Sequence, residues 1–279
     1  MITRCRPLLG TLVEITVPDV ATAAIAPAFD AIAHVHARMS FHESGSDLGR
    51  LRAAMPGEMI AVDRETIAVL RMALAFYEAT DGLFDVTIGR QLVSSRFLPK
   101  DGLGHLNRFN GTSADIAIVD DTQVRIGRRV LIDLGGIAKG HAVDRAVEVL
   151  IAHGAPMGLV NAGGDLRAFG DHDWPVQLRD ADDVVRFMVP ARNCAIASSA
   201  NLLNRKRLRG SLHGPHIGLD RKPVLVDERI TVVAEWCIIA DAMTKIAMVD
   251  PALADDILAA HKGYVLRNAR VAATMAEAV

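Results

Sequence analysis

The order of helical and extended patterns along the chain restricts its fold more than any other feature. In "LIDLGGIAKGHAVDRAVEVLIAHG", residues 131–154, an apolar run and a Gly pair lead from a predicted strand into an amphipathic helix. A second Gly pair, in "MGLVNAGGDLRAFG", joins two predicted strands directly. Strands and helices therefore follow in irregular order, which predicts an α+β fold rather than a regular series of βαβ units.

The rest of the chain continues this mixture. Helical periodicity predicts helices over residues 21–39, 66–80 and 237–249. Further strands are predicted over residues 11–17, 117–119, 123–126, 176–178, 184–189, 195–197 and 229–236. Residues 91–113 are irregular and rich in glycine, which predicts a loop. No linker clearly divides the chain, so we expect a single domain over residues 1–279.

Composition excludes several classes of protein. With 279 residues, 51% of them hydrophobic and 23% charged, the chain has the composition of a globular protein with a sizeable core. A net charge of −2 gives no general attraction to nucleic acid. The three cysteines lie far apart, without metal or disulfide spacing, as is typical of a reducing compartment. We see no signal peptide, lipobox or long apolar span, so we expect a cytoplasmic protein without a membrane span.

The first Gly pair has the features of an anion-binding turn. Gly135 and Gly136 permit close backbone approach, and the helix that begins near Ala138 exposes free N–H groups at its positive end. Lys139 adds a full positive charge. The stretch matches neither the P-loop nor the dinucleotide-binding fingerprint, so an ordinary turn remains the alternative.

Two further segments carry acidic residues beside glycine. In "DGLFDVTIG", Asp85 and Thr87 alternate on one side of a predicted extended segment, with Phe84 on the other. In "NAGGDLRAFG", the simplest interpretation is a tight hairpin with Asp165 on the surface.

Hydroxyl and imidazole groups follow later in the chain. Ser198 and Ser199 come after a predicted strand. Their hydroxyls are candidates either for binding phosphate or for capping a helix. His213 and His216 lie in a Gly/Pro-containing loop near Asp220, so each is a candidate general base.

The order of these motifs resembles that of the ApbE-like family, the FAD:protein FMN transferases, over nearly the whole chain. The segments that carry the resemblance are "LLGT", "SFHESGSDLGRL", "TDGLFDVTIG", "IDLGGIAKGHAVD", "NAGGDLRAFG", "IASSA" and "ITVVAEWCIIADAM". Taken singly each motif is weak, but their order along the chain is typical of this family.

The resemblance implies an activity and a set of site residues. Family members cleave FAD and, with Mg²⁺, transfer its FMN half to a Ser or Thr hydroxyl of an acceptor protein. It implies FAD contacts from Leu9, His42, Leu83, Phe84, Asp85, Asp133, Lys139, Ser198 and Ser199. It also implies His216 as the catalytic histidine, although the choice between His213 and His216 stays open, and Asp241 with the Gly136 carbonyl as metal ligands.

Some positions depart from the family pattern. Lys245 stands where the family has a metal-binding Thr, four residues after Asp241, and Thr244 lies one residue early. An ammonium has no lone pair for a metal, so Lys245 either replaces the cation or forms an ordinary surface ion pair with Asp241. The histidine loop is shorter than in the family, and His42 replaces a large aromatic residue. The alternatives are therefore a catalytically weak FAD-binding protein, an FAD pyrophosphatase, or a purely structural module.

Overall fold

A computed structural model gives the structure of residues 1–180 and 182–266. The chain divides into two compact units, which we describe separately. Unit 1 contains residues 1–31, residues 139–203 and the chain from Val226 onward, and unit 2 contains residues 32–138 and 204–225. Helices and antiparallel sheets occur in irregular order, which confirms the predicted α+β class. The prediction of a single domain stays a prediction.

Unit 1 is built on a seven-stranded sheet in which every pair of neighbours is antiparallel. In spatial order its strands are β1 (Ile2–Leu8), β2 (Thr11–Val17), β6 (Gly158–Ala162), β7 (Asp165–Phe169), β10 (Ala195–Ser199), β13 (Ile230–Ala234) and β14 (Tyr264–Leu266). The predicted strand over residues 11–17 is confirmed, with alternating burial. Strand β1 lies at the edge of the sheet and is mostly exposed, so no burial alternation marked it in the sequence.

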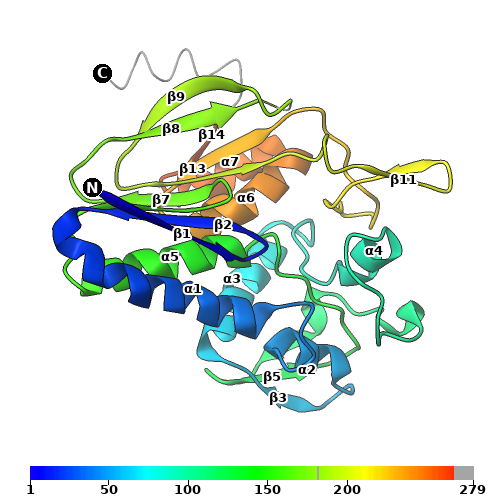
Figure 1. Ribbon diagram of the computed structural model, residues 1–279. Coiled ribbons are helices and arrows are strands. Elements are labelled where there is room, and N and C mark those ends of the chain that lie inside the picture. The colour runs from blue at the N-terminus through cyan, green and yellow to red at the C-terminus, as the bar shows by residue number, and fades with distance from the viewer. Residues whose placement is uncertain (181, 267–279) are drawn as a thin grey trace. The chain divides into compact units, whose positions relative to one another are not determined.

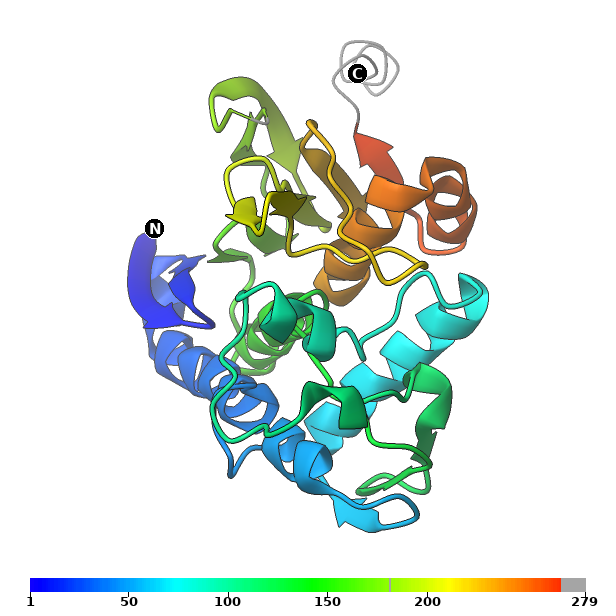
Figure 2. The same cartoon turned by 90° about the vertical axis from the view of Figure 1, so that its right-hand side faces the viewer.

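Other elements of unit 1 pack on this sheet. The hairpin of β8 (Trp174–Arg179) and β9 (Val185–Ala191) is separate from the seven-stranded sheet (Figure 1). Its side chains share an apolar core with side chains from β7, β10, β13 and β14. Helix α6 (Cys237–Val249) packs against β10 and β13, and α7 (Pro251–Ala259) packs against α6 and β14 (Figure 2). Helix α5 (Ala138–Ala152) buries its apolar stripe.

A helical stretch near the N-terminus passes a simple test for a membrane span. The 3₁₀-helix η1 (Asp19–Ala24) and helix α1 (Ile25–Met39) together are long and apolar enough to cross a membrane, by length and composition only. A core helix or a signal sequence passes the same test. Here the apolar stripe of Ile25, Phe29, Ile32 and Val35 is buried, as in a core helix. The absence of a membrane span therefore stays a prediction.

Unit 2 has less regular structure. Its helices are α2 (Asp47–Ala53), α3 (Arg64–Ala79), α4 (Gly89–Ser94), η2 (Leu106–Arg108) and η3 (Ser113–Asp115). Its strands are β3 (Met59–Ala61), β4 (Ile116–Ile118) and β5 (Gln123–Ile126), in the order β3-β5-β4, with β11 (Lys206–Leu208) and β12 (Ser211–His213) as a separate hairpin. The predicted hairpin of residues 117–126 is confirmed.

The structure corrects several predictions in unit 2. Residues 131–134 form no strand, because their backbone bonds join a turn and a helix start: the Asp133 N–H donates to the Val86 carbonyl and the Leu131 carbonyl accepts the Gly89 N–H. The Leu131 side chain packs in an apolar cluster with Phe41 and Phe109. The segment around Asp85 is a series of turns rather than an extended segment. Helix α4 begins at Gly89. This position requires glycine, because a Cβ there would lie 2.6 Å from the Leu131 carbonyl oxygen. The predicted loop of residues 91–113 therefore includes helical turns.

Candidate functional site

The predicted site residues fall in both units. Unit 1 holds Leu9, Lys139, Ser198, Ser199 and Asp241. Unit 2 holds His42, Leu83, Phe84, Asp85, Asp133, Gly136 and His216.

One end of the seven-stranded sheet brings the unit 1 residues together. The β1–β2 turn has Leu9 and Gly10 at positive φ, 56° and 73°, a geometry that matches the twist of a two-residue hairpin. For Leu this backbone conformation costs on the order of 1–3 kcal/mol. Gly163, in the β6–β7 turn, lies beside Thr11, since a Cβ on Gly163 would lie 2.4 Å from the Thr11 Oγ1. The antiparallel register places the end of β10, with Ser198, at the same end of the sheet.

The serines at this end are held by hydrogen bonds to threonines. The Ser198 Oγ lies 2.8 Å from the Thr231 Oγ1 on the neighbouring strand β13. The Ser199 Oγ lies 2.8 Å from the Thr244 Oγ1 on α6. Both serines belong to β10 itself, whereas the sequence predicted them to follow the strand. Ser199 thus links the end of the sheet to the helix that carries Asp241.

Helices α5 and α6 approach each other closely at Gly140. A Cβ on Gly140 would lie 2.2 Å from the carbonyl oxygen of Cys237, so only glycine fits this crossing. The Gly140 N–H donates to the Asp241 Oδ2 at 3.1 Å. One of the helix-terminal N–H groups that the sequence predicted to be available for an anion is therefore occupied by a carboxylate of the chain itself.

Asp144, on α5, fixes the start of α6. Its Oδ1 accepts the Cys237 N–H and its Oδ2 accepts the Ile238 N–H, each at 2.9 Å. The Arg167 guanidinium pairs with the same carboxylate at 3.0 Å. Burial raises the pKa of Asp144, although Arg167 and these N–H groups oppose the rise. The Asp144 carboxylate on α5 therefore acts as an N-cap for α6. This cap fixes the start of α6, and Asp241 lies one turn further along that helix.

Around this crossing two buried carboxylates meet two partly exposed ammonium groups, which together we call the Lys–Asp cluster: Lys139, Asp165, Asp241 and Lys245. The Lys139 Nζ pairs with the Asp165 Oδ2, and the Lys245 Nζ pairs with the Asp241 Oδ1. The Lys245 Nζ also donates to the Asp241 carbonyl oxygen at 2.9 Å. Asp165 is 1% exposed and Asp241 0% exposed, so neither a surface Asp165 nor a surface Lys245–Asp241 pair is correct.

The electrostatics of the cluster follow from burial and from opposite charges. Burial acts to lower the pKa of Lys139, but the Asp241 and Asp165 carboxylates outweigh it and raise that pKa above its ordinary value. Burial raises the pKa of Asp165, and the neighbouring charge of Asp241 adds to the rise. Burial also acts to raise the pKa of Asp241, but the Lys245 and Lys139 ammonium groups outweigh it and lower that pKa. Asp241 is therefore held as a carboxylate between two cations.

In unit 2, the Asp85 carboxylate is surrounded by donors. Its Oδ1 accepts the Thr87 N–H, the Thr87 hydroxyl and the Ser113 hydroxyl, each at 2.7 Å. Its Oδ2 pairs with the Arg221 guanidinium. Phe84 next to it is buried and packs edge-on against Phe76 of α3, with ring centroids 5.8 Å apart. These contacts give Asp85 a fixed position in the turn.

Arg221 connects this turn to the histidine loop. The loop closes on itself, since the His216 carbonyl accepts the Val224 N–H at 2.8 Å and the Gly218 N–H donates to the Lys222 carbonyl at 2.9 Å. Arg221 has a positive φ of 60° at the tip of this turn. Its ion pair with Asp85 holds the loop that carries His216. Sequence reasoning missed Arg221, because no local pattern pairs residues 136 positions apart.

The two candidate histidines differ in their surroundings. His213 ends strand β12, and its Nδ1 lies 2.8 Å from the Ser95 Oγ. His216 lies in the loop beyond that strand and is half-buried. The choice between them as catalytic base stays a prediction.

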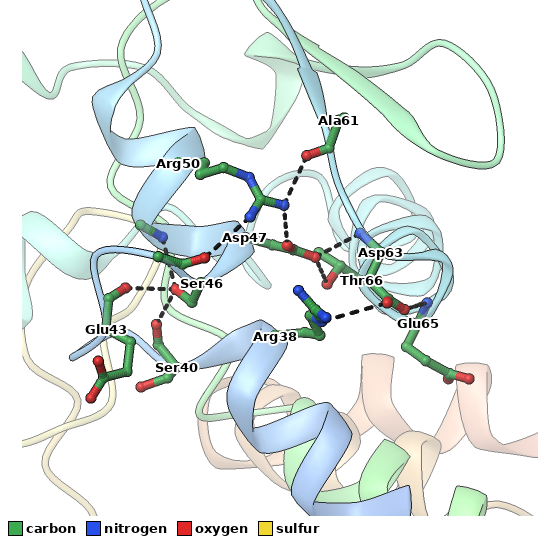
Figure 3. A network of polar contacts seen from close by, with 12 residues as sticks. Arg38, Ser40, Glu43, Ser46, Asp47, Arg50, Ala61, Asp63, Glu65 and Thr66 are labelled. Atoms are coloured by element: carbon green, nitrogen blue, oxygen red, sulfur yellow. Dashed lines mark hydrogen bonds and ion pairs between the residues drawn. The ribbon is translucent and has the colours of Figure 1, made fainter.

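The loop that carries His42 is anchored by a buried polar network. Ser46 caps α2, with its Oγ accepting the Gly49 N–H at 3.0 Å. The carboxylate of Asp47 is buried between Arg50, the Asp63 N–H and the Thr66 hydroxyl (Figure 3). Asp47 thereby ties α2 to the start of α3, while His42 remains exposed.

The residues predicted to bind Mg²⁺ do not fit a metal at Asp241. The Asp241 Oδ1 faces the Lys245 ammonium and its Oδ2 accepts the Gly140 N–H. Thr244, the nearest hydroxyl on the helix, donates to the Asp241 carbonyl oxygen at 2.7 Å. An ammonium cannot ligate a cation. Both carboxylate oxygens of Asp241 are therefore engaged by the chain's own donors.

These features define an α+β protein with a buried Lys–Asp cluster at one end of an antiparallel sheet. A family model described as "ApbE family" matches residues 9–265. The chain belongs to the ApbE family.

Curated relatives support this placement at modest identity. An FAD:protein FMN transferase from Treponema pallidum is 27% identical over 189 residues, covering 58% of this chain and 52% of the relative. One from Rhodobacter capsulatus is 28% identical over 190 residues, covering 62% of this chain and 36% of the relative. The chain thus spans about half the length, or less, of these relatives.

Solved structures share the fold. The ApbE protein from Thermotoga maritima has a TM-score of 0.80 at 25% identity, covering 95% of this chain and 96% of that one. The apo form of the flavinyl transferase ApbE from Pseudomonas stutzeri has a TM-score of 0.77 at 18% identity, covering 92% of this chain and 87% of that one. At this identity, the second likeness concerns the fold alone.

Proposed function

We propose that this protein is an FAD:protein FMN transferase. In this reaction a Ser or Thr hydroxyl of an acceptor protein attacks the FMN phosphorus of FAD. The new phosphoester bond joins FMN to the acceptor, the P–O bond to the AMP half breaks, and AMP leaves. The hydroxyl proton passes to a base.

The observation that carries this proposal is the family match over residues 9–265. The names of the curated relatives support the same activity. FAD is the substrate that the family implies, and a flavoprotein with a target Ser or Thr is the acceptor that we propose.

This chain's own residues suit parts of the reaction. We assign His216 the role of base for the incoming hydroxyl, in a loop that Arg221 holds against Asp85. We assign FAD contacts to the residues named from the resemblance, including Leu9, whose backbone has an unusual conformation. Lys139 supplies positive charge for the pyrophosphate, as cations do in phosphoryl transfer.

The direct test mixes the protein, FAD and an acceptor flavoprotein domain, and measures two products. Intact mass spectrometry should detect FMN added to the acceptor, and chromatography should detect an equal amount of AMP. An acceptor with its target Ser or Thr changed to Ala should gain no mass.

Two variants of the protein separate the candidate bases in the same assay. His216→Ala should lower the rate by about 10²–10⁴-fold if His216 is the base, while His213→Ala should have a much smaller effect. The reverse ranking would assign the base to His213. Failure of wild type to modify any acceptor while it binds FAD would contradict the transferase proposal.

A second candidate function is FAD binding without efficient transfer. It is favoured by the Lys245 ammonium on Asp241, where the family resemblance implies a metal. This function predicts FAD binding, measured by quenching of flavin fluorescence, with no AMP release. An FAD pyrophosphatase, with water as the acceptor, would instead release AMP and free FMN without an acceptor protein.

A further inference from the structure

The position of Lys245 determines which cation lies beside Asp241. Lys245 follows Asp241 by one helical turn on α6, and its ammonium contacts both the Asp241 Oδ1 and the Asp241 carbonyl oxygen. Carboxylate and carbonyl oxygens of this kind are the ligands that hard divalent cations bind in proteins. The lysine side chain is only 20% exposed, so it is packed against the protein rather than extended into solvent.

The Lys–Asp cluster is already neutral without a metal. The carboxylates of Asp165 and Asp241 face the ammonium groups of Lys139 and Lys245. A divalent ion at Asp241 would give this buried cluster a net charge of +2, and the added ion would lie next to Lys245. Because the ion would share the buried Asp241 carboxylate with the Lys245 ammonium, repulsion between the two positive charges opposes Mg²⁺ binding unless Lys245 leaves that carboxylate.

The neighbouring side chains give a metal little alternative. The Asp241 Oδ2 is held by the Gly140 N–H, and the Thr244 hydroxyl is engaged by the Asp241 carbonyl oxygen and by Ser199. Asp165, the other carboxylate of the cluster, is paired with Lys139. The Asp241 carboxylate, the Thr244 hydroxyl and the Asp165 carboxylate thus each already have a partner within the chain.

We propose that the Lys245 ammonium is the resident cation at Asp241 and takes the place of a divalent metal there. Lysine serves elsewhere as a point charge beside phosphate groups. If the protein cleaves FAD as proposed above, Lys245 then supplies positive charge near the pyrophosphate, and cleavage needs no divalent ion at Asp241. This catalytic part rests on the proposed function, whereas the metal-binding part does not.

The first experiment measures metal binding without FAD. Mn²⁺ would be titrated into wild type, Lys245→Thr and the double variant Lys245→Thr/Asp241→Asn, with bound Mn²⁺ followed by electron paramagnetic resonance. We expect Lys245→Thr to bind one Mn²⁺ at least 10-fold more tightly than wild type, and the double variant to lose that gain. Lys262→Met, which removes an exposed lysine of the same unit, is the matched control and should behave as wild type.

If Lys245→Thr does not fold, Mn²⁺ titration of the wild-type protein and of Asp241→Asn still tests the metal-binding part of the proposal. A single tight Mn²⁺ site in wild type that disappears in Asp241→Asn would overturn the proposal. Equal Mn²⁺ affinity of wild type and a folded Lys245→Thr would overturn it as well.

The second experiment tests the catalytic part by AMP release from FAD, with EDTA or with Mg²⁺. We expect wild-type rates within about twofold of each other in the two conditions, and a loss of at least 10-fold in Lys245→Met. Release that needs Mg²⁺ would overturn the catalytic part, and so would metal-dependent release gained only in Lys245→Thr. If wild type releases no AMP in either condition, the proposed transferase fails, while the Mn²⁺ titration still decides what occupies Asp241.

Discussion

At the scale of single residues, the Lys–Asp cluster depends on a glycine, Gly140, and on a lysine, Lys245. Gly140 has no Cβ, which lets α5 approach the Cys237 carbonyl and donate its N–H to Asp241. Lys245 places an ammonium where a neutral hydroxyl would leave room for a metal. Both effects act over a few ångströms, so substitutions at these positions have effects that the contacts predict directly.

Gly140→Ala should destabilise the protein. The new methyl group would lie 2.2 Å from the Cys237 carbonyl oxygen, which forces α5 and α6 apart at the cluster. Overpacking of this kind costs about 1–3 kcal/mol, more than the roughly 1 kcal/mol that alanine gains over glycine within a helix. Urea denaturation followed by circular dichroism measures the difference.

The matched control for this prediction is Gly45→Ala. A Cβ on Gly45 would contact no atom within 4 Å, so its unfolding midpoint should stay close to that of wild type. A Gly140→Ala protein as stable as Gly45→Ala would show that the two helices adjust without cost.

At the scale of elements, polar side chains from one segment complete the ends of another. Asp144 on α5 caps α6, and Asp47 on α2 accepts the backbone N–H of Asp63 just before α3. In unit 2, Asp115 joins η3 to the β4–β5 hairpin, since its Oδ2 accepts the Thr112 N–H and its Oδ1 pairs with Arg128, each at 2.8 Å. Such contacts fix the angles between elements.

The Asp115 contacts predict a pH dependence of stability. Burial acts to raise the pKa of Asp115, but the hydrogen bonds from Arg128 and Thr112 outweigh it, and the folded-state pKa lies below the ordinary value of 3.8. A folded pKa below the unfolded one means that the stabilisation is fully present above about pH 4 and is lost as pH falls through the folded value. Asp115→Asn should therefore flatten the fall of unfolding free energy with decreasing pH below about pH 4.

Urea denaturation at a series of pH values measures this slope. Arg128→Gln removes the same ion pair from the other side and should also flatten the curve. A slope in Asp115→Asn equal to that of wild type would contradict the assignment.

At the scale of the whole molecule, each of the two units is built from segments far apart in the sequence. Residues predicted to contact FAD occur in both units: Lys139 belongs to unit 1, and Asp85 belongs to unit 2. A ligand that binds the native protein but not the unfolded chain raises the free energy of unfolding.

FAD should therefore raise the thermal midpoint of the protein. At a free FAD concentration 100 times its dissociation constant, the stabilisation is about 2.7 kcal/mol, and it should grow with the logarithm of concentration. Differential scanning calorimetry with FAD and, as a comparison, with riboflavin measures this. A midpoint that does not change up to high FAD concentration would contradict FAD binding, and with it the proposed function.

The sequence by itself determined the features that depend on local patterns. The residue pattern predicted the strand over residues 11–17, and helical periodicity predicted the helix over residues 237–249. The order of the motifs pointed to the family, which the match over residues 9–265 confirms. Each strand, helix and motif signal lies within a short window of the chain, and only the order of the motifs extends over most of it.

Only the tertiary structure decided which of those residues meet. Asp165 appeared to be a surface turn residue, yet it is buried against Lys139, 26 positions away. Leu131 had a strand-like pattern, yet it belongs to none of the strands in the described part of the chain and packs in an apolar cluster. The pattern along a chain records which side of an element is apolar, but the partner of a buried charge depends on segments that folding brings together, and that information is not local.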